Sequence, residues 1–323
     1  MPRALSIDHA RWIVENLLAG VAAEDLVTTL ATQMPVARAR REVSQIASSP
    51  LLAVCASLAG RAAQLELVAA IARAHARGEP AATEVERRTT PPAEEFYRHY
   101  WAAHRPVVLT DLTRRWPALR RWTPAFFHDE LGGQTIEVMT NARRMERRRT
   151  RMRAFIDALG DTSDYMVAHN DTMKRRAFAR LLDDVRAPAT LFEPTRARAT
   201  ALWIGPAGTV TSLHHDTTNI KICQIHGRKR VELVSPQETA LLAGGVDGFF
   251  SDLDLARRAD SPHPAVRDLL VKTVVVAPGD ALFIPAGWWH QVTSLDVSVS
   301  FSLLGFRRPN DFGWYRPGDT VGR

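Results

Sequence analysis

Two segments far apart in the chain carry side chains suited to binding a transition metal. His214 and Asp216 stand two positions apart, and His290 lies in a second segment near the end of the chain. In a β-strand, residues two apart point to the same face, so His214 and Asp216 can converge while His215 faces away. A histidine from a neighbouring strand would complete two imidazoles and one carboxylate, the facial triad that holds non-haem Fe(II) with open coordination positions. Because His-x-Asp alone is a weak signal, the surrounding sequence decides its weight.

A lysine shares the apolar face of a strand predicted just downstream. Residues 219–225 and 229–234 are predicted to be two strands joined by a tight turn at His226-Gly227. Alternation gives the second strand a buried face with Lys229, Val231 and Leu233, and a solvent face with Arg228, Arg230 and Glu232. A buried ammonium is costly unless an anion meets it, although a lysine at a strand end can also extend into solvent. Beside a metal triad, Lys229 indicates a bound dicarboxylic cosubstrate.

The strand predicted after His290 has an alternation of its own. Apolar residues and serines alternate strictly over residues 297–302, with Ser300 among the serines. Such a strand can pack its apolar side on a core while its small hydroxyls line a cavity. It can equally lie at the surface with its serines in water, and the pattern alone leaves both interpretations open.

Ordered motifs along the chain resemble one known family. They are Leu202–Asp216, Gln224–Pro236 and Pro278–His290, preceded by Phe96–Tyr100, Arg105–Thr110 and Trp116–Trp122. These runs closely resemble the JmjC or cupin-like 2-oxoglutarate oxygenases over roughly residues 88–310, and most of all the small hydroxylases of the type that acts on an asparagine of hypoxia-inducible factor. The resemblance implies an α+β fold, a double-stranded β-helix or jelly-roll barrel with flanking helices and an N-terminal helical region.

The resemblance also implies which residues bind the metal and the cosubstrate. The implied metal ligands are His214, Asp216 and His290, and the implied 2-oxoglutarate residues are Lys229, Thr211, Tyr165, Asn219 and Ser300. Lys229, Thr211 and Tyr165 match the residues that receive the distal carboxylate. The other two positions depart from the family pattern. Asn219 lies one residue earlier than the asparagine of the animal enzymes, and Ser300 stands where some relatives have asparagine.

By this resemblance the function is a dioxygenase that uses Fe(II), 2-oxoglutarate and O2. It would hydroxylate an amino-acid side chain in a peptide or protein and release succinate and CO2. One alternative is a hydroxylase or demethylase of an RNA nucleoside or a small metabolite. Others are a non-catalytic, metal-stabilised JmjC-like binding protein, and a cupin isomerase that uses its metal as a Lewis acid. Lys229 and Thr211 argue against the non-catalytic alternative, because a scaffold needs no cosubstrate pocket.

An arginine-rich segment is the strongest charge feature of the chain. Residues 143–153 hold seven arginines and one glutamate, in a chain of formal net charge +7. We predict a loop near the mouth of the site in which Arg147, Arg148 and Arg149 attract an acidic substrate. A solvated loop without function is the plain alternative. Nucleic acid is a weaker one, because no aromatic residues alternate with the arginines.

Two further residues are candidate substrate contacts. His169 and Asn170 follow Tyr165 on a predicted strand that would line the cavity. Their place after Tyr165 is the only support for this prediction, and a purely structural role is the more common outcome for such residues.

Length and composition fit a cytoplasmic enzyme with two domains. The chain has 323 residues, 46% of them hydrophobic, and two cysteines that provide no disulfide framework. The N-terminus lacks the apolar core of a signal peptide, and no apolar run is expected to reach the length of a membrane span. We therefore expect a reducing cytoplasm, which suits Fe(II), and no membrane partner.

Residues 1–85 are predicted to be a helical region and residues 86–323 the JmjC/cupin-like catalytic domain. The helical spacing predicts helices at 10–18, 21–32, 36–48 and 51–76, the last broken near Gly60. These helices are expected to cap the barrel structurally. The alternative is a module for substrate recruitment or for forming a homodimer.

Overall fold

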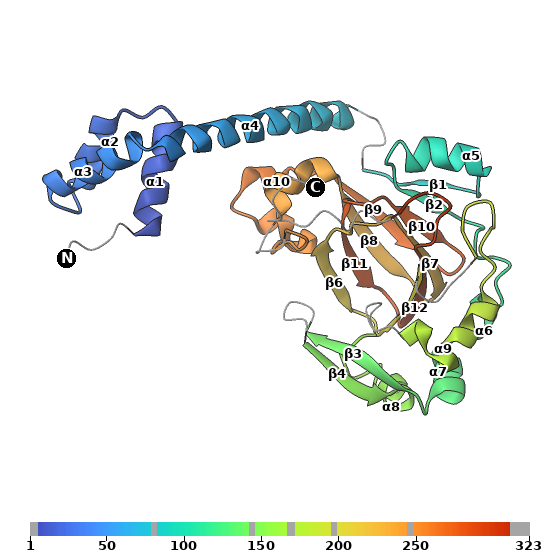
Figure 1. Ribbon diagram of the computed structural model, residues 1–323. Coiled ribbons are helices and arrows are strands. Elements are labelled where there is room, and N and C mark those ends of the chain that lie inside the picture. The colour runs from blue at the N-terminus through green and yellow to red at the C-terminus, as the bar shows by residue number, and fades with distance from the viewer. Residues whose placement is uncertain are drawn as a thin grey trace. The chain divides into compact units, whose positions relative to one another are not determined.

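The computed structural model describes residues 6–78, 83–141, 146–166, 172–194, 199–243 and 248–310. The chain divides into two compact units, residues 1–75 and 76–323, and each unit is described by itself (Figure 1). The predicted domain boundary between residues 85 and 86 therefore lies within the second unit, close to its start.

The N-terminal unit is helical. Its helices are α1 (Ile7–Leu18), α2 (Ala23–Leu30), α3 (Val36–Ala47) and α4 (Pro50–Arg77), the last of which ends just beyond the unit boundary. Side chains of α1, α2 and α3 form its small core, in which the buried residues are Ile13, Leu26, Val27, Leu30, Ala39 and Val43. Apolar residues spaced three and four apart on each of these short helices produce this core, as amphipathic helices do.

Helix α4 differs from the prediction in two ways. It continues through Gly60 without a break, because a single helical glycine costs only about 1 kcal/mol relative to alanine. By length and composition alone it is also apolar enough to cross a membrane, so the expectation that no segment reaches that length is wrong. One such helix is weak support for a membrane span, and α4 carries Arg61 and Glu66 near its middle.

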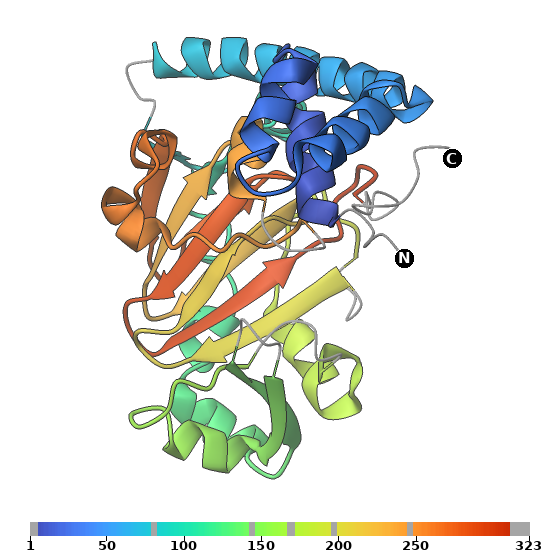
Figure 2. The ribbon, with the colours of Figure 1, turned by 90° about the vertical axis from the view of Figure 1, so that its left-hand side faces the viewer.

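The second unit contains two facing β-sheets, the jelly-roll barrel that the sequence predicts (Figure 1, Figure 2). The larger sheet has the strand order β1-β2-β10-β7-β12-β5 and the smaller one the order β6-β11-β8-β9. The larger sheet contains β1 (Glu86–Arg88), β2 (Val107–Leu109), β5 (Thr200–Gly205), β7 (Ile220–His226), β10 (Ala281–Ile284) and β12 (Ser298–Leu303). The smaller sheet contains β6 (Val210–His214), β8 (Lys229–Val234), β9 (Val271–Val276) and β11 (Trp289–Ser294).

Helices and a hairpin flank the barrel. A two-stranded hairpin is formed by β3 (Thr135–Asn141) and β4 (Glu146–Arg151). The α-helices are α5 (Ala93–Phe96), α6 (Ala118–Arg121), α7 (Pro124–Leu131), α8 (Met152–Asp157), α9 (Arg176–Ala179), α10 (Thr239–Leu242) and α11 (Pro264–Arg267). Other helical turns are the π-helical Tyr97–Trp101 and the 3-10 turns Thr172–Lys174, Arg180–Asp184, Pro236–Glu238 and Leu255–Asp260.

Buried residues form separate cores on the two faces of the larger sheet. Between the sheets lie aliphatic residues of both, such as Val231, Leu233, Leu282 and Ile284. On the outer face, aromatic residues from the sheet and from the covering helices pack together, including Phe301 and Trp122 with ring centroids 5.4 Å apart. The larger sheet is therefore covered on both faces, except at its edge strand β1, whose residues are exposed or half-buried.

Strand β12 resolves the two interpretations of its alternating pattern. All six of its residues are buried, which excludes a surface strand with serines in water. Val299, Phe301 and Leu303 pack in the aromatic outer core. The serines take the opposite face, toward the inside of the barrel, where the Ser300 hydroxyl donates to Oε1 of Gln224 at 2.8 Å.

The predicted solvent face of β8 is covered at one of its three residues. Arg228 is exposed and Arg230 is partly exposed, as predicted, but Glu232 is 6% exposed, so its expected exposure is wrong. Its carboxylate lies 3.6 Å from the Arg230 guanidinium. The cause is tertiary: α10, α11 and the turn Leu255–Asp260 pack their apolar residues on the outer face of the smaller sheet. Alternation identified the two faces of the strand but could not show that the outer face is covered at Glu232.

Lys221, in the middle of the larger sheet, is an unexpected buried charge. Its side chain is fully buried in the outer core, where the ammonium lies 4.6 Å and 4.9 Å from the ring centroids of Phe96 and Phe283. Among the described residues, Nζ finds no hydrogen-bond partner. Burial lowers the pKa of Lys221 to about 7, and the two rings offset only part of this penalty by cation–π attraction.

We expect Lys221→Met to stabilise the protein. The folded pKa lies below the unfolded value of 10.5, so the wild type gains stability as pH rises from about 7 toward 10.5. Each pKa unit corresponds to about 1.4 kcal/mol, and methionine removes the penalty. Urea unfolding at pH 6, 8 and 10 should therefore show a gain that is largest at pH 6. A variant less stable than wild type at pH 6 would contradict this explanation.

Candidate metal centre and cosubstrate pocket

Antiparallel pairing of β6 with β11 brings the predicted triad together. His214 and His290 are direct partners across the two strands, and their ring centroids are 4.2 Å apart. Asp216 follows the end of β6, with its carboxylate 3.8 Å from Nε2 of His290. One donor atom from each of the three residues lies within 4.8 Å of the others. This is the arrangement that the spacing predicted, two imidazoles and a carboxylate around one point.

Local backbone contacts orient both imidazoles. Nδ1 of His214 lies 2.7 Å from the carbonyl oxygen of Ser212, and Nδ1 of His290 lies 2.9 Å from that of Trp288. A carbonyl can only accept, so each Nδ1 carries the proton and donates it. Each Nε2 therefore presents its lone pair toward the shared point, as in metal sites whose second hydrogen bond fixes the tautomer.

The surroundings keep His290 neutral. The residue is 2% exposed, and burial, followed by the nearby His214, lowers the pKa of His290 below its ordinary value. His215 points away from the centre, as predicted, and packs edge-on against Trp289 at 4.7 Å between ring centroids. The donor set of neutral nitrogens and a half-exposed carboxylate fits a divalent ion of the Fe(II) type.

A bulge in β6 turns Thr211 toward the same interior face as His214. Residues three apart normally point to opposite faces of a strand, but His214 pairs with His290 and Thr211 pairs with Val292, only two residues further along β11. The extra residue on β6 therefore places the side chains of Thr211 and His214 on the same face of the sheet. Thr211 forms a side-chain hydrogen bond with Tyr165, whose hydroxyl pKa is raised by burial. The two predicted cosubstrate residues thus lie in contact.

Lys229 opens the next strand of the same sheet. It pairs with Ser294 of β11, in phase with Val231 and Leu233, and is 8% exposed, so it is buried as predicted. Burial lowers the pKa of Lys229 to about 8. Most molecules therefore carry a buried ammonium at pH 7, and a carboxylate would stabilise it strongly.

The turn before Lys229 requires glycine and is fixed by Gln224. Gly227 has φ +64°, and a Cβ there would lie 2.2 Å from the carbonyl oxygen of Val297. The Gln224 amide donates to the carbonyls of His226 and Gly227 at 2.7 Å and 2.8 Å. Ser300, predicted as a cosubstrate residue, gives its hydroxyl proton to this glutamine. Ser300 therefore contacts the glutamine that fixes the turn before Lys229.

Asn219 contacts the metal-binding loops rather than the Lys229 end of the pocket. Its Oδ1 accepts from the backbone N–H of Ala286, and its Nδ2 donates to Oδ1 of Asn310. The N–H of Gly287 donates to the carbonyl of Asp216 at 2.8 Å. The segment that carries Asp216 and the turn that leads to His290 are thus joined by two hydrogen bonds.

Asn310 completes this junction, and no sequence pattern marks it. Its Oδ1 accepts from the Asn219 backbone, and its Nδ2 donates to the carbonyls of Asn219 and Leu304 at 2.9 Å and 2.8 Å. An asparagine just beyond the last strand has no recognisable spacing to the triad. Only the fold brings it within reach of Asn219.

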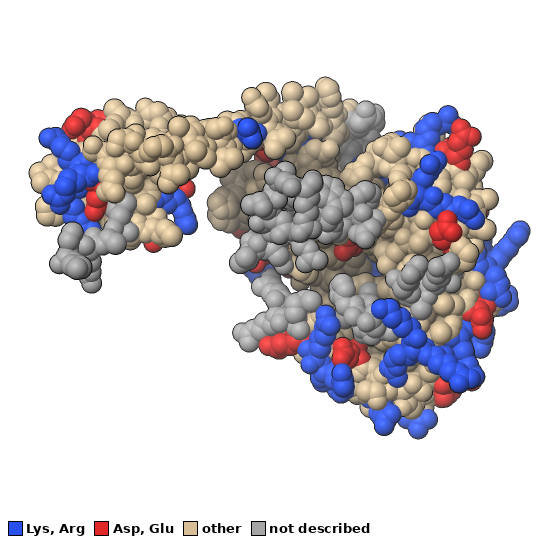
Figure 3. All heavy atoms as spheres, viewed as in Figure 1, with Lys and Arg blue, Asp and Glu red and all other residues tan. Residues whose placement is uncertain are grey.

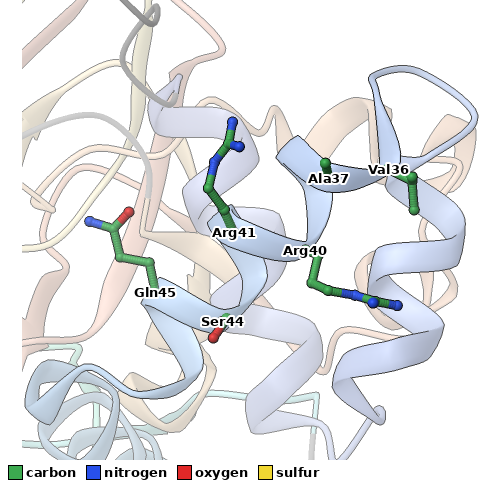
Figure 4. Close-up of a pocket in the computed structure, with 6 residues that line it drawn as sticks. All are labelled: Val36, Ala37, Arg40, Arg41, Ser44 and Gln45. Atoms are coloured by element: carbon green, nitrogen blue, oxygen red, sulfur yellow. The ribbon is translucent and has the colours of Figure 1, made fainter.

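Of the remaining predicted residues, His169 and Asn170 fall outside the described residues, so the structure does not test them. Arg147, Arg148 and Arg149 are on β4 of the hairpin rather than in a loop, so that part of the prediction is wrong. A separate hollow runs along α3 in the N-terminal unit and includes none of the triad (Figure 4); its lining residues are Val36, Ala37, Arg40, Arg41, Ser44 and Gln45.

Comparison with known proteins places this geometry in a family. The model of the cupin-like domain matches residues 92–304, which is most of the second unit. Lysine-specific demethylase 8 of Xenopus tropicalis is 28% identical over 68% of this chain and 52% of its own length. Jumonji C domain-containing protein 5 of Drosophila melanogaster is 27% identical over 68% of this chain and 59% of its own length. The chain therefore spans little more than half the length of these relatives.

The chain belongs to the cupin-like family of JmjC-type oxygenases. Enzymes of this family use Fe(II), 2-oxoglutarate and O2, and the triad and the buried Lys229 fit that set of cofactors. A further relative, tRNA wybutosine-synthesizing protein 5 of Danio rerio, is 26% identical over 72% of this chain and 76% of its own length. The expected special closeness to the asparaginyl hydroxylases is not supported by these matches and stays a prediction.

We expect Asn310→Ala to weaken metal binding in this JmjC-type centre. The substitution removes the contacts that hold Asn219, and losses of such outer contacts typically cost 10–100-fold in metal affinity. The visible band of bound Co(II), titrated anaerobically, measures this affinity without turnover. Asn310→Asp keeps the acceptor for Asn219 and should fall between wild type and alanine. Equal Co(II) affinity in all three proteins would refute the assignment.

We expect Lys229→Met to weaken 2-oxoglutarate binding at least 100-fold while leaving Co(II) affinity unchanged. The reason is that a carboxylate would lose its charge-assisted partner in a buried pocket. In wild type, Lys229 loses its proton as pH rises through about 8, so affinity should fall above that pH. Calorimetric titration between pH 6.5 and 9.5 measures both effects. A Met variant with the same pH profile as wild type would exclude Lys229 as the carboxylate partner.

Proposed function

We propose that this protein is an Fe(II)- and 2-oxoglutarate-dependent hydroxylase of an amino-acid side chain in a peptide or protein. The observation that carries the proposal is the joint placement of His214, Asp216 and His290 with Lys229 inside one barrel. An isomerase or a binding protein would need the metal ligands but not the buried ammonium. A cytoplasmic location, where both free thiols and Fe(II) stay reduced, is part of the proposal.

The protein's residues divide the work in the following way. When bound, the iron, 2-oxoglutarate and O2 supply the oxidation that converts a C–H bond to C–OH and releases succinate and CO2. Lys229 receives the distal carboxylate of 2-oxoglutarate, and Thr211 with Tyr165 presents hydroxyls to it. The wall around His290 excludes water, and the half-exposed side of Asp216 leaves the approach open to substrate.

The position and charge of the β3–β4 hairpin favour an acidic or carboxylated substrate. Met139 of β3 bridges to Tyr165 on one side and pairs with Arg147 on the other, so β4 lies two strand spacings, about 10 Å, from the Tyr165 backbone. Figure 3 shows Lys and Arg side chains gathered over this part of the molecule. A basic surface this close to the pocket raises the local concentration of acidic partners.

The three arginines of the hairpin have different surroundings. Arg148 lies on one face of β4 and binds the nearly buried carboxylate of Asp164, which makes it structural. Arg147 and Arg149 lie on the other face, and the Arg149 side chain is 79% exposed beside Glu137. Arg147 and Arg149 are therefore the two that we assign to substrate attraction.

A modified RNA nucleoside is the second candidate substrate. The match to the tRNA wybutosine-synthesizing protein covers 76% of that relative, whereas the matches to lysine-specific demethylase 8 and Jumonji C domain-containing protein 5 cover 52% and 59% of theirs. The same basic hairpin could meet phosphates, whose contribution to binding falls steeply with salt. We favour the peptide because the described arginines of β4 have no aromatic residues between them for stacking on bases.

The proposal predicts succinate formation that depends on a peptide. Anaerobic Fe(II) and 2-oxoglutarate should give the visible band of their chelate. After oxygen is admitted, an acidic peptide library should give succinate and a product heavier by about 16 Da, the mass of one oxygen atom. Asp216→Ala should abolish both the succinate and the heavier product. Turnover with tRNA and none with peptides would support the nucleoside alternative, and no band at all would refute the oxygenase.

A double substitution tests the role of the hairpin in the same assay. Arg147→Ser with Arg149→Ser should raise KM several-fold, leave kcat unchanged and reduce the dependence of KM on salt, because charge attraction acts on encounter. The matched control is Arg40→Ser with Arg257→Ser, which removes two exposed arginines away from the hairpin that pair with Glu24 and Asp260. Equal effects of both changes would mean that overall charge matters and the hairpin position does not.

A further inference from the structure

Helix α4 exposes a run of large apolar side chains along its length. Among the described residues, the core of the N-terminal unit is built from α1, α2, α3 and their connections, and α4 contributes none of its members. The exposed residues, each with at least half of its surface accessible, are Leu51, Val54, Leu58, Leu65, Leu67, Val68 and Ile71. Soluble proteins rarely leave so continuous an apolar surface unless another molecule covers it.

Five of these seven residues have the spacing of a coiled coil. Leu51, Val54, Leu58, Leu65 and Val68 are separated by three, four, seven and three positions, so they occupy a and d positions of a heptad repeat. Position 61, between Leu58 and Leu65, is the one charged position in this series. The helix has 28 residues, and at 1.5 Å per residue it is about 42 Å long.

Two charges near the middle decide against a lipid surface as the partner. Arg61 and Glu66 would lie near the centre of a bilayer, where charged side chains are strongly disfavoured. Between two helices, both charges can reach the edge of the interface or each other. We infer that α4 pairs with the α4 of a second copy of this chain, in antiparallel orientation.

The charges also select the orientation. A parallel pair would place Arg61 against the partner's Arg61 inside the seam, where like charges repel. In the antiparallel pair each a residue meets a d residue, so Leu58 lies against the partner's Val68 and Arg61 against the partner's Leu65. The partner's Glu66 is then next along the partner helix. Because the flanking Ala62 and Ala69 are small, the Arg61 side chain can pass over them to that carboxylate, which also pairs with Arg73 of its own helix, and symmetry forms the interhelical contact twice.

The remaining contacts are complementary in size. In the antiparallel register, Ile71 lies over the partner's Ser57, and Cys55 lies beside the partner's Ala69. A large side chain thus meets a small one on one edge of the seam, and two small ones meet on the other. This interface is independent of the catalytic proposal, since it uses no residue of the barrel.

Sedimentation of the 323-residue chain at micromolar concentration tests the inference. Wild type should be a dimer, and Leu58→Glu with Leu65→Glu should be a monomer whose thermal transition for the barrel is unchanged. The matched control, Ala56→Glu with Ala63→Glu, adds the same charge on the opposite face of the helix and should remain dimeric. A monomeric wild type, with or without binding to phosphatidylcholine–phosphatidylserine vesicles, would overturn the proposal.

A short bismaleimide tests the orientation. In the antiparallel dimer the two Cys55 residues are far apart, so wild type should not cross-link. Ala69→Cys places a thiol beside the partner's Cys55 and should give a covalent dimer, whereas Ala70→Cys, which points away from the seam, should not. In a parallel dimer the two Cys55 residues lie at the same level, so cross-linking of wild type through Cys55 would overturn the antiparallel arrangement.

Discussion

The pairing of β6 with β11 is the interaction on which the site depends. It places His214 opposite His290, and the bulge within it turns Thr211 inward beside Tyr165. Both imidazoles are then oriented by carbonyls of their own strands or turns, so the metal centre needs no distant side chain to fix its tautomers. A slip of one residue in this pairing would send the ligands to the outer face of the sheet.

Asp216, the carboxylate ligand of the triad, is positioned in a different way. Asp216 lies beyond the end of β6, where no ladder of strand hydrogen bonds can position it. Backbone bonding to Gly287 and the Asn219–Asn310 pair replace that ladder. Two ligands of the triad thus come from paired strands and the third from a loop held by hydrogen bonds, and the side chain of Asp216 stays partly exposed.

Lys221 and Lys229 both lose hydration on burial, but their surroundings differ. Lys229 faces the inside of the barrel, where an acid can meet it, and the proposed function depends on that cost being offset by the cosubstrate. Lys221 faces the outer aromatic core and meets only two rings. The N-terminal unit presents a similar contrast, because α1 to α3 bury their apolar faces together while α4 leaves its own for a partner.

The sequence alone determined the family, the jelly-roll architecture, the triad and the burial of Lys229, because each of these depends on local alternation or on ordered motifs. Tertiary structure alone decided the rest. The β6 bulge, the covering of Glu232 and the junction of Asn219 with Asn310 come from neighbours distant in sequence, which strand periodicity cannot reveal. The hairpin around Arg148 has the same origin, since an arginine run looks like a solvated loop until Asp164 is brought to meet it.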